Sequence, residues 1–143
     1  MREVGPKNNQ RERVILQEQD WPEVLKIVIQ EINDEQDGFN FQVSYDKEGK
    51  FYVLESVNDF YVHLEIHNSL VKIRNIFAIE KGNGYGKMIM NKLIEVIKKH
   101  KNLKVSKIIA DNVSQTEVAK KFWKNLGFKW SKDNLLNMEL EII

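Results

Sequence analysis

The clearest chemical signal in the chain is a glycine-rich stretch between an apolar run ending at Ile79 and a long helical pattern beginning near Tyr85. Its glycines stand at every second position, as Gly82, Gly84 and Gly86. Because glycine has no Cβ, main-chain N–H groups can converge on an anion there. The first turn of the next helix adds unpaired donors and the positive end of its dipole. The spacing therefore predicts a loop that binds the phosphates of a cofactor.

Two common phosphate-binding motifs do not fit this stretch. A dinucleotide-binding turn, G-x-G-x-x-G, would need glycine at Lys87. A Walker A loop would need glycine at Lys81 and a hydroxyl residue at Met88 to hold magnesium. The cofactor must therefore be held by a different arrangement of the same main-chain donors.

Three segments resemble the GNAT N-acetyltransferase superfamily. Residues 81–86 (KGNGYG) resemble its Q/R-x-x-G-x-G/A pyrophosphate loop, with Lys81 in place of the usual glutamine or arginine. Residues 116–128 (TEVAKKFWKNLGF) are similar to the N-x-x-A-x-x-F-Y-x-x-x-G-F stretch that follows the fifth strand of the family. Residues 15–28, which include Asp20-Trp21-Pro22-Glu23, are similar to the first strand and first helix of many members.

The resemblance covers about residues 11–143 and implies an α/β (α+β) fold. It implies a GNAT-like mixed, mostly antiparallel central sheet with a splayed parallel strand pair and flanking helices. The cofactor implied is acetyl-CoA (CoA), whose pantetheine arm would lie between the splayed strands. The arm would pair with free main-chain groups of Phe77, Ala78 and Ile79. The pyrophosphate would be held by the amides of Gly82, Asn83, Gly84, Tyr85 and Gly86, with the charges of Lys81 and Lys87 beside it.

Hydrophobic periodicity predicts the elements that position this loop. Helical spacing favours a first helix from Trp21 to about Glu35, with Asp20 as its N-cap and Glu23 completing a capping box. Further helices are expected at 85–99 and 116–126, and strands at 11–17, 39–45, 51–56, 61–67, 71–79, 105–110, 128–130 and 136–142. A helical crossover makes strands 71–79 and 105–110 parallel. Segment 39–45 is one strand more than the simplest layout of the family needs, so it is either a member of the sheet or a flap.

Two positions depart from the family pattern. Members usually carry asparagine at the position of Thr116 and tyrosine, often the general acid, at that of Trp123. Threonine can still cap a helix, and we expect both residues to contact the cofactor. The indole N–H donates a hydrogen bond but is no proton source near neutral pH. A thiolate can leave without full protonation. The preferred hypothesis is therefore an enzyme that transfers the acetyl group directly to an amine. The alternative is a CoA-binding regulatory or interaction module with weak or no turnover.

A general base should lie on the central strands and face the acceptor. Strand alternation places Tyr61, His63, Glu65 and His67 on one face, and we select Glu65 and His67 as catalytic candidates. The competing interpretation is that this polar stripe is simply the solvated face of an antiparallel strand. We expect no metal site, because His63 and His67 would be ~13 Å apart along a strand.

Composition narrows the class of protein. At 143 residues with 42% hydrophobic composition, we expect one domain over residues 11–143 after a flexible leader at 1–10. A net charge of +1 argues against nucleic acid as a partner, and no apolar run approaches the ~20 residues of a membrane span, so we expect a cytoplasmic protein. With no cysteine, acyl transfer would be direct, in a ternary complex with a small-molecule or peptide amine. A homodimer is compatible with the sequence.

Overall fold

The computed structural model describes residues 13–79 and 82–142 of the chain. Its helices are α2 (Glu23–Glu35), α3 (Tyr85–Lys99) and α4 (Glu117–Asn125), with short 3-10 turns η2 (Glu18–Asp20) and η3 (Lys101–Leu103). Its strands are β1 (Arg13–Ile15), β2 (Phe41–Asp46), β3 (Phe51–Ser56), β4 (Phe60–His67), β5 (Leu70–Ala78), β6 (Lys107–Ala110), β7 (Lys129–Trp130) and β8 (Met138–Glu141). None of the helices described has the length and apolar character to cross a bilayer.

The strands form one mixed sheet in the order β1-β2-β3-β4-β5-β6-β8-β7. Neighbouring strands are antiparallel except β5 and β6, which are parallel as the helical crossover predicts. Strand β2 lies between β1 and β3 and pairs with β3 along its whole length, so segment 39–45 contributes a true member of the sheet and no flap. The predicted mixed α+β architecture with its parallel pair is confirmed.

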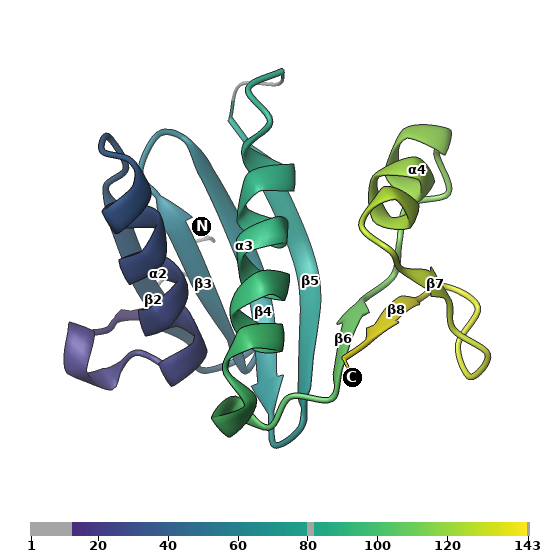
Figure 1. Cartoon of the computed structure of the whole chain (residues 1–143), viewed down its shortest axis with the longest axis horizontal. Helices are drawn as coiled ribbons and strands as arrows, with labels where there is room; N and C mark the ends of the chain where they lie inside the picture. Colours follow the sequence, from purple (N-terminus) through teal and green to yellow (C-terminus); the bar gives the residue numbers. More distant parts are fainter. Residues whose placement is uncertain (1–12, 80–81, 143) are drawn as a thin grey trace, which may run out of the picture.

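Helices α2 and α3 cover one face of strands β2 to β5, whereas α4 and strands β6 to β8 lie beyond β5 (Figure 1). Both helices present a stripe of aliphatic residues to the sheet, as helical spacing predicts. The core between them and the sheet contains Leu25, Val28, Ile32, Ile89, Val96, Ile97, Val43, Leu54, Val62, Leu64, Val71 and Ile73. This packing fixes α3 over β5, and with it the start of α3 beside the end of that strand.

The predicted start of the first helix is wrong. Asp20 belongs to the η2 turn, α2 begins at Glu23, and its N-cap position is held by Pro22 with no side-chain hydrogen bond. Trp21 is extended (φ −67°, ψ 142°) because the proline ring that follows excludes the helical region for the preceding residue. Its indole N–H donates to the carbonyl of Leu16 at 3.2 Å instead of lying on the helix face.

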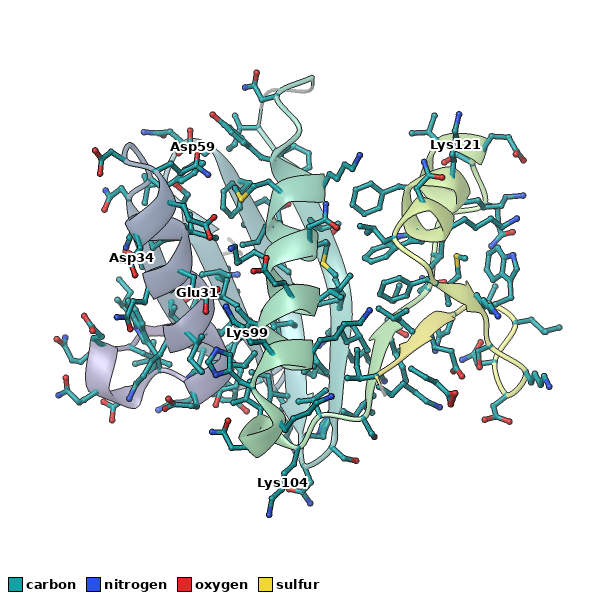
Figure 2. The ribbon with its side chains drawn as sticks, viewed as in Figure 1. Glu31, Asp34, Asp59, Lys99, Lys104 and Lys121 are labelled. Carbon is teal, nitrogen blue, oxygen red and sulfur yellow. The ribbon has the colours of Figure 1, made fainter. Side chains whose placement is uncertain are left out.

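An ion network joins α2 to α3. The side chain of Lys92 is only 8% exposed and lies 3.7 Å from Glu31 and 3.3 Å from Glu95, with Glu35 as its hydrogen-bond acceptor. Figure 2 shows Glu31 and Lys99 at the same seam, where they form a further ion pair at 3.0 Å. The hydrogen bond to Glu35 raises the pKa of Lys92 although burial opposes it. The contribution of Lys92 is therefore complete at neutral pH and is lost as the pH rises through that raised pKa. The hydrogen bond from Lys99 lowers the pKa of Glu31, so the contribution of Glu31 is lost as the pH falls through that lowered pKa.

Lys92→Ala should lower the free energy of unfolding by about 2 kcal/mol, because the variant loses the buried stem and the cation that three carboxylates share, and Lys99 then reaches only two of them. Urea unfolding followed by circular dichroism would measure the change. Lys98→Ala, on an exposed position of the same helix, is the matched control and should change stability by less than ~0.5 kcal/mol. Equal stability of the two variants would contradict a stabilising network.

Candidate functional site

Strands β5 and β6 separate part-way along their length. They pair from Leu70 to Ile73 on β5 and from Lys107 to Ala110 on β6, and the N–H of Asp111 donates to the carbonyl of Ile73 at 2.8 Å. Beyond this bond β5 continues to Ala78 paired with β4 alone. A β-bulge marks the same point, because the β4–β5 register skips Arg74. The outer edge of β5 is therefore unpaired after the bulge.

The separation opens a pocket of about 500 Å³ between β5 on one side and the β6–α4 connection on the other. We call it the β5–β6 pocket. It is lined by Ile73, Arg74, Asn75, Ile76, Ala78, Gly86, Asp111, Asn112, Val113, Ser114, Thr116, Val118, Ala119, Phe122 and Trp123. The pocket is apolar along α4 and polar at the point of separation. This is the expected form of a site for a long ligand with an apolar arm.

The N-terminus of α3 lies at this pocket and is uncapped. Gly84 holds the N-cap position with φ 72°, no described side chain caps the helix, and its first turn contains no acidic residue. By contrast α4 is capped by the Thr116 hydroxyl, which accepts from the N–H of Ala119 at 3.2 Å. The first-turn N–H groups of α3 have no carbonyl within the helix to bond. They are therefore available to an anion, which the helix dipole also favours.

The three glycines differ in their conformations. Gly82 (φ 94°) and Gly84 (φ 72°) are left-handed, a region that L side chains rarely adopt, and a Cβ on either would meet nothing within 4 Å. Gly86 is helical, and a Cβ there would lie 3.7 Å from the ring of Phe122 and 3.8 Å from Ile76. The main chain thus offers a cradle that is open on its outer side and borders the pocket at Gly86.

The remaining loop residues predicted to bind the cofactor contribute in different ways. Asn83 and Lys87 are exposed. The ring of Tyr85 packs against Phe39 at 5.3 Å and Phe60 at 5.9 Å between centroids, so its side chain contributes to the core beside the loop. Lys81 lies outside the described residues.

The free main-chain groups of β5 differ from those predicted. The N–H of Ile79 donates to the carbonyl of Asp59 at 2.8 Å, so the prediction that it is free is wrong. Neighbouring residues of an antiparallel strand direct their main-chain groups to opposite edges. Phe77, two residues before Ile79, therefore also faces β4. The groups of Ile76 and Ala78 face the β5–β6 pocket, so of the three residues predicted only Ala78 offers its main chain there.

Comparison with known proteins identifies the architecture. No family model and no curated protein matches the chain. Among solved structures, the ribosomal-protein-S18-alanine N-acetyltransferase from Escherichia coli superposes with a TM-score of 0.52 at 14% identity, over 91% of this chain and 92% of that one. The putative acyl-CoA N-acyltransferase from Klebsiella pneumoniae gives 0.52 at 9% identity, over 92% and 97%. The chain has a GNAT-like fold. The IAA acetyltransferase from Bacillus cereus agrees, with a TM-score of 0.50 at 12% identity over 91% and 98%.

In this GNAT-like fold, Thr116 and Trp123 both line the β5–β6 pocket. Thr116 is the N-cap of α4. Trp123 is buried, with its ring edge-on to Phe122 and Phe128 at centroid distances of 5.0 Å each. The two aromatic contacts and the position in the core show that Trp123 helps to pack α4 against the segment that follows it. One edge of it remains available to form a wall of the pocket.

The structure does not bring Glu65 and His67 to the pocket. Glu65 lies opposite Lys72 on β5, before the bulge, where β5 is still paired with β6. His67 lies further from the pocket, at the β4–β5 turn. Their side chains are engaged with each other at 2.8 Å, and Arg74 lies 3.6 Å from Glu65. Strand alternation identified their face correctly but contained no information on where along the strand the sheet opens.

Asp111 is the acidic residue that the sequence analysis missed. It follows β6 directly, lines the β5–β6 pocket at the point of separation, and is half-buried. Its main-chain N–H is held by Ile73, whereas its carboxylate has no partner among the described residues. The signal was present, because a carboxylate immediately after a strand of a parallel pair stands at the edge where such sheets bind ligands.

His63 is the remaining titratable group near the opening. It lies opposite Asn75, one residue past the bulge, with its ring between Phe51 and Tyr61 at 4.9 Å from each. Burial lowers the pKa of His63, and the charges of Arg13 and Arg74 lower it further against the opposing effect of Asp46. The imidazole is therefore neutral at pH 7.

Proposed function

We propose that the protein is an acetyl-CoA-dependent N-acetyltransferase that moves an acetyl group to a primary amine by direct transfer in a ternary complex. One observation carries the proposal: an uncapped helix N-terminus preceded by left-handed glycines opens onto a pocket between two separating parallel strands. The GNAT-like fold of the chain supports this proposal, and so does the acyltransferase description of the solved structures that it resembles.

The described residues fit CoA. The amides at residues 82–86 would hold its pyrophosphate, with Lys87 close by as a mobile positive charge. The apolar pocket wall of Ala119 and Phe122 would pack along the pantetheine, and the outward N–H and carbonyl groups of Ile76 and Ala78 would pair with its amides. When bound, acetyl-CoA supplies the activated thioester carbonyl that an amine can attack.

Asp111 would take the proton of the attacking amine. The nitrogen becomes acidic as its bond to the carbonyl carbon forms and the carbon–sulfur bond breaks, so a carboxylate at the point of separation can accept its proton and pass it to solvent. The sulfur leaves as a thiolate, which is consistent with a buried Trp123 that has no proton to give. Positioning of the amine by the pocket would supply most of the rate enhancement.

The second candidate function is a CoA-binding regulatory or interaction module without turnover, which the indole at position 123 favours. Titration calorimetry with CoA and release of free thiol from acetyl-CoA with a panel of amines separate the possibilities. Micromolar CoA binding with amine-dependent thiol release supports the transferase. Binding without thiol release from any amine would favour the module, and no binding at millimolar CoA would refute both.

A further inference from the structure

Four rings form a continuous row on the face of the sheet opposite α2 and α3. Phe51 on β3 stacks on His63 on β4, followed by Tyr61 on β4 and Phe77 on β5. The centroid distances are 4.9, 4.9 and 5.2 Å, and no pair is tilted by more than 32°. Because His63 is neutral, the whole row is uncharged. We call these residues the aromatic row.

The aromatic row ends on β5 at Phe77, which lies between two lining residues of the β5–β6 pocket, Ile76 and Ala78, and is not itself a lining residue. Phe77, its last ring, is 44% exposed and lies on β5 after the point where β6 has separated. The opposite wall also carries exposed apolar side chains, Val118 at the start of α4 and Leu136 before β8. Leu136 is tied to this wall because its carbonyl accepts from the N–H of Val113, a lining residue, at 2.7 Å. Exposed apolar side chains on the two sides of an opening are typical of a binding site.

The charges on this face are only partly paired among the described residues, since Lys72 and Asp46 also form no ion pair there. Glu65 is held by Arg74 and His67, and the guanidinium of Arg74 also lies 4.6 Å from the centre of the Phe51 ring. Asp111, at the pocket, has no partner among the described residues. Glu55 accepts a hydrogen bond from Gln42 but has no cation beside it among those residues, and it lies two strands away from the pocket.

We infer that the acceptor is a primary amine carried by an aromatic or other large apolar group, which lies on the exposed Phe77 end of the aromatic row. This inference rests on the proposed function and narrows its substrate class. The ammonium group would face the unpaired carboxylate of Asp111, while the apolar body would extend the stack of rings. The alternative is a polyamine whose second cation reaches Glu55 across the same face.

The test compares 2-phenylethylamine, ethanolamine and spermidine as acceptors of the full-length protein. We expect the highest kcat/KM for 2-phenylethylamine. Phe77→Ser should raise its KM at least tenfold, with kcat within about threefold and CoA affinity unchanged. Phe77→Leu, which keeps apolar bulk, should restore most of the loss and guards against a folding defect. Ile15→Ser, at a 61% exposed position on β1, is the matched control and should change nothing.

Two results would overturn the inference. One is a preference for spermidine that Glu55→Gln abolishes. The other is an unchanged KM for 2-phenylethylamine in Phe77→Ser.

If CoA binds but no amine releases thiol, the transferase proposal fails. Calorimetry of 2-phenylethylamine with the CoA-loaded protein then decides the inference by itself: binding that Phe77→Ser removes supports it, and absence of binding refutes it.

Discussion

Gly86→Val is expected to weaken CoA binding about 30-fold, or roughly 2 kcal/mol, the size of one or two lost charge-assisted hydrogen bonds. The new Cβ would lie 3.7 Å from the Phe122 ring and 3.8 Å from Ile76, so the valine methyls would occupy the part of the β5–β6 pocket next to the glycine cradle. A phosphate or pantetheine group could then no longer approach the amides of the first turn of α3.

The fold should tolerate this substitution. Gly86 lies within α3 with an ordinary helical φ, and both new contacts are at normal van der Waals distances. Valine is also a somewhat better helix former than glycine. Gly84→Val would be a poorer test, because a β-branched residue at φ 72° would add backbone strain of about 1–3 kcal/mol and confuse binding with stability.

Titration calorimetry with CoA, together with urea unfolding, would measure both effects. Asn91→Val, an exposed position further along α3, introduces the same side chain away from the pocket and should leave CoA affinity unchanged. If Gly86→Val bound CoA as tightly as the parent protein, the cofactor site would have to lie elsewhere.

The sequence was sufficient to predict the elements and their layering. The helix at 85–99 was predicted with the bounds of α3 because its aliphatic residues keep a 3.6-residue period from the glycine loop to the lysine-rich end. The parallel pairing of β5 with β6 followed from the helical crossover. The predicted N-cap at Asp20 is wrong, because Pro22 excludes a helical backbone at Trp21. This restriction outweighed the capping preference of an aspartate.

The geometry of the site was less accessible to prediction. Alternation shows which face a residue occupies, but the bulge at Arg74 and the end of β6 determine where the sheet opens. Both depend on pairing between distant segments. For this reason Glu65 and His67 were placed on the correct face but away from the pocket, and Asp111 was overlooked. Likewise, assigning free main-chain groups to Phe77 and Ile79 required the pairing of β5 with β4, which local sequence does not contain.

Asp111→Asn is expected to lower kcat about 100- to 1,000-fold, the usual contribution of a general base, with CoA affinity unchanged. Asparagine keeps the size of the side chain and the main-chain bond to Ile73 that closes the paired part of β5 and β6. It cannot accept the proton that the amine nitrogen loses as it bonds to the carbonyl carbon. Steady-state thiol release, with calorimetry for CoA, would measure the two quantities separately.

Glu65→Gln is the matched control, since it removes a carboxylate on β4 that does not line the pocket, and it should change kcat less than about threefold. The loss of kcat in Asp111→Asn, relative to the parent protein, should also become smaller as the pH rises. Hydroxide can then replace the missing base, and a larger share of the amine is unprotonated. A purely structural role for Asp111 would not produce that recovery. If Glu65→Gln lost activity and Asp111→Asn kept it, the proton would leave through the face of β4, and the opening between β5 and β6 would serve only to bind the cofactor.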